Sequence, residues 1–251
     1  MLEVKNLSVD YGSVSILKDI SFTVSDNQWL MIVGPNGAGK STLVHAISQS
    51  TAYKGSVLLC GSNIAGMKPI HIAKHIGVLS QKHDMSYSFT VEEVVRLGRY
   101  AYSNGIFSGT NEEDDDKIQS AMQAAGLAKV RNQSVLTLSG GELQRTFLAQ
   151  VLAQDPKILI LDEPSNHLDL VYQKQVFTLI QKWLKNPGRI VISVVHDLSL
   201  AKAFGTHALL MNKGELLNFG PIDKALDNKS LNKAYSIDVE GWMQYMLSQW
   251  S

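Results

Sequence analysis

The sequence predicts an α/β fold in which a helical segment interrupts the alternation of strands and helices. An apolar strand, Trp29–Val33, runs directly into a glycine-rich loop that opens a helix. Patterns typical of helices then dominate from about Thr90 to Ala153, and strands return only after Pro156. We therefore expect one domain over residues 1–251, with an α/β core at 1–89 and 154–225, an inserted helical subdomain at 90–153 and a C-terminal helical appendage at 226–251.

Length and composition limit the class of protein. The chain has 251 residues, 45% of them hydrophobic, which is enough for a large core, and its formal net charge of zero argues against a surface built for nucleic acid. One cysteine, Cys60, excludes an internal disulfide and suits a reducing compartment. No apolar run approaches the roughly 18 residues of a membrane span, and Met1–Lys5 lacks the apolar stretch of a signal peptide. We therefore expect a soluble, cytosolic chain that reaches a membrane only through a partner.

The first third of the chain reads as short strands around one helix. We expect an antiparallel edge, then the buried strand Trp29–Val33, a helix from about Lys40 to Ser48 and a glycine-bounded strand at Gly55–Gly61. The strands of the antiparallel edge are expected at Leu2–Val4, Val9–Tyr11 and Ile20–Val24.

The middle of the chain carries helix-start signals. Thr90 and Glu93 form a capping box, in which each side chain bonds the other residue's backbone N–H. The acidic run Glu112–Asp116 predicts the start of a helix that extends to about Ala125, because acidic residues favour the positive end of the helix dipole. We interpret the run as a solvated helix start rather than a metal site.

Strands and helices alternate again in the last third. The expected order is a strand at Lys157–Leu161, helix Leu170–Leu184, strand Arg189–Val195, helix Ser199–Phe204, and strands Ala208–Met211 and Glu215–Phe219 joined by the turn Asn212-Lys213-Gly214. In the appendage from about Ile222, we interpret three aromatic residues as packing anchors rather than a ligand site: Trp242, Tyr245 and Trp250.

The strongest chemical signal is a phosphate-binding loop, Gly34-Pro35-Asn36-Gly37-Ala38-Gly39-Lys40-Ser41. Between a strand and a helix, its backbone N–H groups converge on an anion at the helix N-terminus. Lys40 is placed for the β- and γ-phosphates, the Ser41 hydroxyl for magnesium, and Thr42 adds a hydroxyl donor. The loop predicts ATP and Mg²⁺ as cofactors in a P-loop nucleotide-hydrolase core of the RecA-like type.

A second motif completes the chemistry. Asp162 and Glu163 follow the apolar strand Ile158–Leu161, and ligands of parallel sheets bind at the carboxyl ends of strands. We expect Asp162 to hold magnesium through a water molecule and Glu163 to orient or deprotonate the attacking water.

A third motif narrows the class of protein. Leu138-Ser139-Gly140-Gly141-Glu142-Leu143-Gln144-Arg145 resembles the signature of the ATP-binding-cassette (ABC) ATPases. Ser139 and Glu142 form another capping box, and the helix from about Gly141 to Leu152 directs its positive end at an anion. In this family the anion is the γ-phosphate held by the other subunit. The resemblance therefore implies the ABC ATPase fold and a head-to-tail homodimer that encloses two ATP molecules.

Further family elements follow in order. The resemblance assigns adenine stacking to Tyr11, contact with magnesium and the attacking water to Gln81, coupling across the dimer to Asp169 in Ser165–Asp169, and γ-phosphate contact to His196. An ordinary strand tyrosine is the alternative for Tyr11. His71 and His75 stand four residues apart, but no third metal ligand accompanies them.

A finer resemblance concerns the task of the protein. Phe89–Tyr100 resembles a segment of type II importers for iron–siderophore, haem, cobalamin and molybdate or tungstate. It implies a groove around residues 82–105 for a permease helix, with core packing as the alternative. The implied assembly lies on the cytoplasmic face of the inner membrane and has two ATPase subunits, two permease copies and an external substrate-binding protein. The alternatives are a free-standing ABC ATPase that acts on nucleic acid or ribosomes and a monomeric P-loop kinase.

Overall fold

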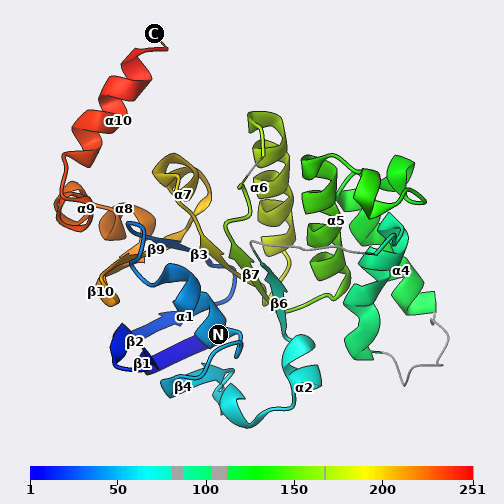
Figure 1. Cartoon of the computed structure of the whole chain (residues 1–251), viewed down its shortest axis with the longest axis horizontal. Coiled ribbons are helices and arrows are strands. Elements are labelled where there is room, and N and C mark those ends of the chain that lie inside the picture. The colour runs from blue at the N-terminus through cyan, green and yellow to red at the C-terminus, as the bar shows by residue number, and fades with distance from the viewer. Residues whose placement is uncertain (81–86, 103–111, 167, 251) are drawn as a thin grey trace. The chain divides into compact units, whose positions relative to one another are not determined.

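The computed structural model describes residues 1–80, 87–102, 112–166 and 168–250 (Figure 1). Its contacts divide the chain into two compact units. Unit 1 comprises residues 1–65 and 193–251, and unit 2 comprises residues 66–192. Both units combine helices with strands, as the α/β prediction requires.

Unit 1 contains the predicted antiparallel sheet, with strand order β2-β1-β4-β5. The first two predicted strands merge into one, β1 (Leu2–Tyr11), which pairs with β2 (Val14–Val24) and β4 (Lys54–Leu59). The short β5 (Ser62–Asn63) closes the edge. Along β1 the buried apolar side chains are Leu2, Val4, Leu7 and Val9.

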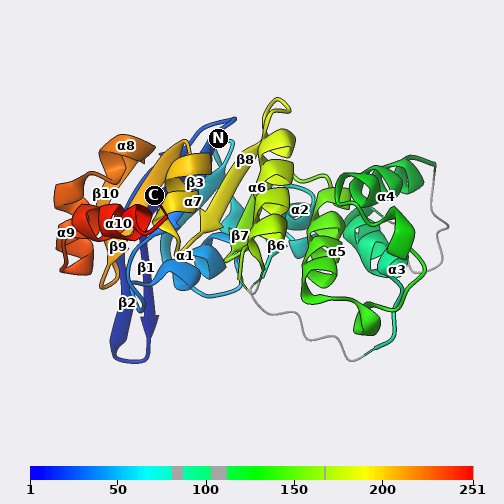
Figure 2. The ribbon, with the colours of Figure 1, turned by 90° about the horizontal axis from the view of Figure 1, so that it is seen from above.

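A second group of strands in unit 1 positions the phosphate loop. β3 (Trp29–Val33) pairs in parallel with β9 (His207–Asn212), which forms the predicted hairpin with β10 (Glu215–Pro221). Every residue of β3 is buried, because α1 (Lys40–Ile47) follows it and α7 (Leu198–Phe204) packs against it (Figure 2). The Trp29 indole is fully buried and donates a 2.8 Å hydrogen bond to the Ser193 hydroxyl.

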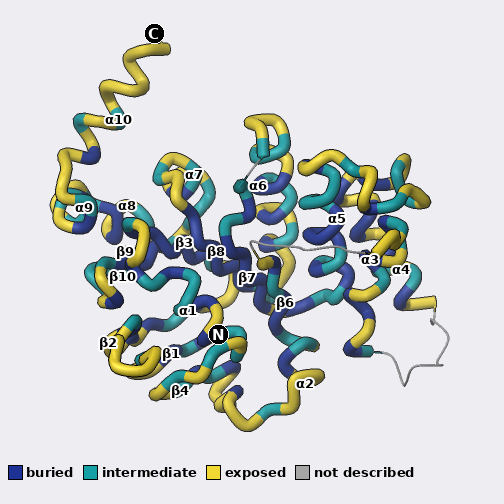
Figure 3. Tube along the Cα trace, viewed as in Figure 1, coloured by how far each residue is buried: buried dark blue, intermediate teal, exposed yellow. Residues whose placement is uncertain are grey.

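The appendage is helical, but its aromatic residues do not anchor it. It consists of α8 (Ile222–Ala225), α9 (Asn228–Tyr235) and α10 (Val239–Ser248), and α10 extends away from α9 (Figure 1). Figure 3 shows most of α10 as exposed. Trp242 is 54% exposed, Tyr245 57% and Trp250 89%, so the interpretation of these three residues as packing anchors was wrong. The helix is held by its N-cap Asp238 and by buried Val239 instead.

Unit 2 holds the remaining strands and the middle helices. β6 (Ile76–Leu79) pairs in parallel with β7 (Ile158–Asp162), and β8 (Ile190–Val194) crosses the boundary between the two units along the chain. The helices of unit 2 are α2 (Pro69–Ala73), α3 (Val91–Arg96), α4 (Glu112–Ala124), α5 (Gly140–Ala153) and α6 (Leu170–Leu184).

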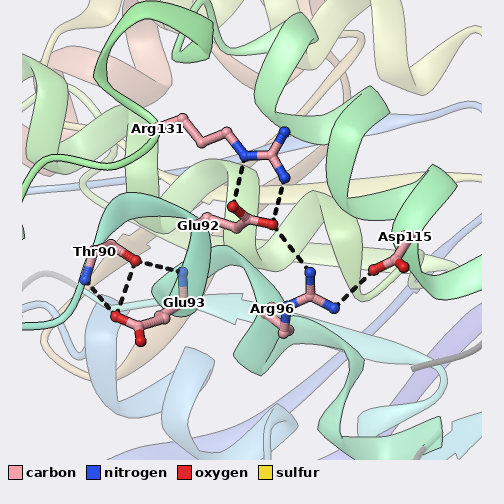
Figure 4. A network of polar contacts seen from close by, with 6 residues as sticks. All are labelled: Thr90, Glu92, Glu93, Arg96, Asp115 and Arg131. Atoms are coloured by element: carbon pink, nitrogen blue, oxygen red, sulfur yellow. Dashed lines mark hydrogen bonds and ion pairs between the residues drawn. The ribbon is translucent and has the colours of Figure 1, made fainter. Parts of the chain in front are cut away.

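Charged side chains fasten α3 to its neighbours (Figure 4). The predicted capping box of Thr90 and Glu93 is present at the start of α3. In the same turn, the Glu92 carboxylate accepts hydrogen bonds from Arg131 at 2.5 and 2.6 Å and from Arg96 at 3.0 Å. These bonds hold the pKa of Glu92 below its ordinary value, with Arg131 the largest cause. The network ties α3 to the chain that precedes α5.

The acidic run that opens α4 is not wholly a solvated helix start, as we had interpreted it. Asp114 is 6% exposed and receives a 2.6 Å ion-pair bond from Arg99, which is also 6% exposed. Arg99 additionally donates to the carbonyl of Ala153 and lies 3.9 Å from the centroid of the Tyr102 ring. Asp115, the residue next to Asp114, forms an ion pair with Arg96 but remains about half exposed. Asp114 therefore faces the interior because a buried guanidinium compensates its charge.

These two adjacent aspartates make a matched test of burial. We expect Asp114→Asn to lower the free energy of unfolding by about 3 kcal/mol, since it leaves a buried guanidinium without its charge partner. Asp115→Asn should cost less than about 1 kcal/mol, because exposed pairs contribute little. Urea denaturation of both variants and the wild type measures the difference. Equal losses would contradict the burial argument.

Candidate nucleotide-binding and signature sites

The phosphate loop of unit 1 has the backbone that its sequence predicts. Gly34 has φ +150° and Gly39 has φ +96°, both in the region that favours glycine. A Cβ atom on Gly34 would lie 2.2 Å from the carbonyl oxygen of Met211, so the loop can pass β9 only without a side chain there. Gly39 is the N-cap of α1, and no side chain caps this helix end. The first N–H groups of α1 therefore lie where the loop closes, which is the arrangement that binds anions.

Lys40 is buried within the loop. It is 6% exposed, and its ammonium group donates to the carbonyls of Gly34 at 2.8 Å and Pro35 at 3.0 Å. The loop itself thus holds the charge beside the helix N-terminus. Ser41 and Thr42 follow in the first turn of α1, both partly exposed.

Two other predicted residues belong to unit 1. His196 is exposed and follows the end of β8, where the N–H of Val195 bonds the carbonyl of Ile32 in β3. His196 and the phosphate loop thus follow the carboxyl ends of neighbouring segments. Tyr11 ends β1 and is 53% exposed, and its hydroxyl lies 2.9 Å from that of Thr51. An exposed tyrosine is compatible with stacking on a base.

The appendage reaches the loop through a residue that the sequence analysis missed. Tyr235 of α9 is hydrogen-bonded to the backbone of Gly34. Burial raises the pKa of Tyr235, and the bond to Gly34 partly offsets that effect. No local sequence pattern predicts this contact, because about two hundred residues separate Gly34 from Tyr235.

The carboxylate pair lies in unit 2, at the end of β7. Asp162 is the last residue of this fully buried strand and is itself 4% exposed. Glu163 has a left-handed backbone with φ +55°, which is uncommon for a residue other than glycine. The turn after it is closed by a 3.1 Å hydrogen bond from the N–H of Asn166 to the carbonyl of Glu163. The Asn166 side-chain amide also donates to the Glu163 carboxylate.

The signature segment, also in unit 2, forms the predicted capping box at the start of α5. The Ser139 hydroxyl accepts from the N–H of Glu142 at 3.3 Å, and the Glu142 carboxylate accepts from the N–H of Ser139 at 2.9 Å. Hydrogen bonds from Ser139 hold the pKa of Glu142 below its ordinary value. Gly140 is exposed, and a Cβ atom on it would meet nothing within 4 Å. The helix start is thus open to an approaching anion.

Asp169 has a structural role that the sequence analysis did not predict. It is the N-cap of α6, and its carboxylate accepts from the N–H of Tyr172 at 2.9 Å. The Tyr172 ring packs against Gly141, where a Cβ atom would lie 2.8 Å away, and the Arg145 guanidinium lies 4.6 Å from its centroid. Asp169 and the signature helix are therefore connected through Tyr172.

Some predicted positions lie outside the described residues. Gln81 is one of them, and so are residues 82–86 and 103–105 of the proposed groove at 82–105. Within the described parts of the chain, no group of three or more His, Cys, Asp or Glu side chains is arranged to hold a metal ion, so neither His71 and His75 nor the acidic run forms such a cluster. Among the same residues, none of the helices is long and apolar enough to span a membrane.

Comparison with known proteins agrees with the motifs. Residues 17–166 match the family model described as ABC transporter. The ABC transporter ATP-binding protein YvrA of Bacillus subtilis is 40% identical over 242 residues, which are 95% of this chain and 54% of YvrA. This chain therefore spans about half the length of that relative. The hemin import ATP-binding protein HmuV of Rhizobium etli is 38% identical over 92% of this chain and 89% of its own length.

The fold is also similar to that of solved ABC transporters. An inward-facing metal-chelate type ABC transporter matches with a TM-score of 0.82 at 24% identity, over 94% of this chain and 89% of the solved one. The predicted fold class is thereby confirmed. The family match covers the phosphate loop, the signature and the carboxylate pair in one stretch. The chain belongs to the ABC transporter family, as an ATP-binding and ATP-hydrolysing subunit similar to those that import metal chelates.

Proposed function

We propose that the phosphate loop of one chain holds ATP while Asp162 and Glu163 of the same chain serve its hydrolysis. The observation that carries this proposal is the loop backbone, with Lys40 buried beside an uncapped helix start. In the proposed site Tyr11 stacks on the adenine, and residues 34–42 hold the phosphates. Glu163 orients or deprotonates the attacking water, and His196 and Gln81 contact the γ-phosphate and the water.

Magnesium fits the residues that are present. Mg²⁺ prefers oxygen ligands and is usually held by one or two carboxylates together with substrate phosphates. Asp162 offers a buried carboxylate at a strand end, and Ser41 and Gln81 offer neutral oxygens. The ion, when bound, would neutralise charge that develops on the phosphates. In this proposal Asp162 acts through a bound water molecule.

We propose that two copies of the chain assemble head to tail. Each signature start, at Ser139, Gly140, Gly141 and Glu142, then faces the ATP held by the partner, and Asp169 couples the two sites. The open N-terminus of α5 supports this role, because its N–H groups and dipole attract an anion. In this arrangement the helices of residues 90–153 act as a signature-bearing subdomain on a core formed by residues 1–89 and 154–225.

We further propose that the dimer powers import through two copies of a separate permease at the cytoplasmic face of the membrane. An external substrate-binding protein would deliver the cargo. The relation to HmuV and to a metal-chelate type transporter supports a metal-containing cargo: an iron chelate, haem, cobalamin, or molybdate or tungstate. The permease helix is expected around residues 82–105.

Co-purification from native membranes tests this assignment. We expect the tagged chain to retain a polytopic membrane protein in stoichiometric amount, and the complex to hydrolyse ATP faster when loaded binding protein is added. Retention on DNA or ribosomes without a membrane partner would support the free-standing ABC ATPase instead. The neutral net charge of the chain makes that second outcome the less expected one.

A further inference from the structure

The turn that follows β7 combines a strained residue with a side chain that holds it. Glu163 adopts φ +55°, a conformation that costs a non-glycine residue free energy and persists only where neighbouring structure enforces it. Pro164 comes next, with a ring that presets the backbone for a tight turn. The 3.1 Å hydrogen bond from the N–H of Asn166 to the carbonyl of Glu163 then closes the turn.

Asn166 contacts Glu163 twice, once through its backbone and once through its side chain. Its amide Nδ2 donates to Oε2 of the Glu163 carboxylate. A glutamate side chain has three rotatable bonds, and a hydrogen bond to its far end selects one of several rotamers. The closed turn fixes the position of Asn166 relative to the backbone of Glu163, so the amide also fixes where the carboxylate points.

We propose that Asn166 is a positioning residue for hydrolysis, which aims the Glu163 carboxylate at the attacking water. The proposal rests on the role of Glu163 proposed above. Asparagine suits this task because its amide donates a hydrogen bond without adding a formal charge beside the nucleotide. The bond engages Oε2 and thereby orients the carboxylate. A misplaced base costs rate even when nucleotide binding is intact, because the reacting atoms must lie in near-attack geometry.

Four variants separate positioning from structural support. Asn166→Ala removes the donor, and Asn166→Asp keeps the shape but replaces the donor with an acceptor. Asn166→Gln keeps the donor on a longer arm, and Asn186→Ala is the matched control, since Asn186 bonds the carbonyl of Trp183 at the far end of α6. We expect kcat to fall about tenfold in Asn166→Ala and at least as far in Asn166→Asp, with the KM for MgATP within about twofold of wild type. Asn166→Gln should recover part of the rate, and Asn186→Ala should match wild type.

Binding and coupling measurements complete the test. A fluorescent ATP analogue should bind each Asn166 variant with the wild-type Kd. The midpoints of thermal unfolding of Asn166→Ala and Asn166→Gln should agree with each other. In a double-mutant cycle with Glu163→Gln, single-turnover hydrolysis should show no further loss from Asn166→Ala, because the group that it positions is already neutralised.

The outcomes also distinguish this inference from the function on which it rests. If Glu163→Gln hydrolyses ATP at the wild-type rate, the proposed role of Glu163 is wrong. If Glu163→Gln is inactive but Asn166→Ala keeps or raises the wild-type kcat, the positioning role alone is overturned. The positioning role would also be overturned if Asn166→Ala weakened nucleotide binding, so that KM and Kd rose equally. The same conclusion would follow if the rate losses of Asn166→Ala and Glu163→Gln were fully additive in the double variant.

Discussion

Glu163→Gln should reduce ATP turnover by 10²–10⁴-fold, which is the usual contribution of a general base and corresponds to about 3–5 kcal/mol of activation free energy. The variant keeps the size of the side chain and its acceptor oxygen but loses the charge. ATP should therefore still bind and, in the presence of Mg²⁺, hold two chains together as a dimer that does not reset. Steady-state hydrolysis measures the loss of turnover, and a binding assay measures the affinity for ATP. Size-exclusion chromatography with ATP measures dimer formation.

Glu113→Gln is the matched control for this experiment. Glu113 is an exposed carboxylate in the first turn of α4, so the same chemical change there should leave turnover and dimerisation as in the wild type. Rapid turnover by Glu163→Gln would show that another group activates the water.

Ser139→Arg should abolish most ATP turnover without weakening ATP binding to the single chain. Ser139 stands at the N-terminus of α5, and its neighbour Gly140 leaves the approach to this helix end open. A long cationic side chain would block the close contact of backbone and phosphate that we propose across the dimer. Hydrolysis assays and ATP binding to the monomer, measured below the concentration at which dimers form, test the two halves of the expectation.

Ser134→Arg controls for the chemistry of the substitution. Ser134 also caps a short helix, the 3₁₀ turn Val135–Thr137, and stands five residues before Ser139. Losing such a cap costs typically about 1 kcal/mol of stability, so both variants should be destabilised to a similar extent. Only the signature variant should lose turnover. If Ser139→Arg lowered the affinity of the monomer for ATP and nothing else, Ser139 would serve its own chain rather than the partner.

Local patterns predicted most of the elements. Helix α6 has the predicted bounds Leu170–Leu184, and both capping boxes formed as expected. Each of these features depends on residues at most four positions apart, so the sequence contains all the partners. The same holds for the phosphate loop, whose glycines lie in one run of eight residues. The chemistry of the candidate site is local in this sense.

Tertiary contacts decided what local patterns could not. Asp114 is buried because Arg99, fifteen residues away, forms an ion pair with it, whereas the neighbouring Asp115 stays near solvent. Trp242 and Tyr245 are large aromatic residues of the kind found in cores, yet each lies on α10 with more than half of its surface exposed. Burial depends on which surfaces meet, and a periodic pattern states only which surface is apolar.

The sequence by itself determined the family, the phosphate loop, the carboxylate pair and the signature, because these are short motifs whose residues act through their own backbone and neighbours. Only the tertiary structure showed that Asn166 holds Glu163, that Tyr172 connects Asp169 to Gly141 and that Tyr235 reaches Gly34. Turn conformation and long-range packing bring these side chains together, and neither leaves a periodic trace in the order of the residues.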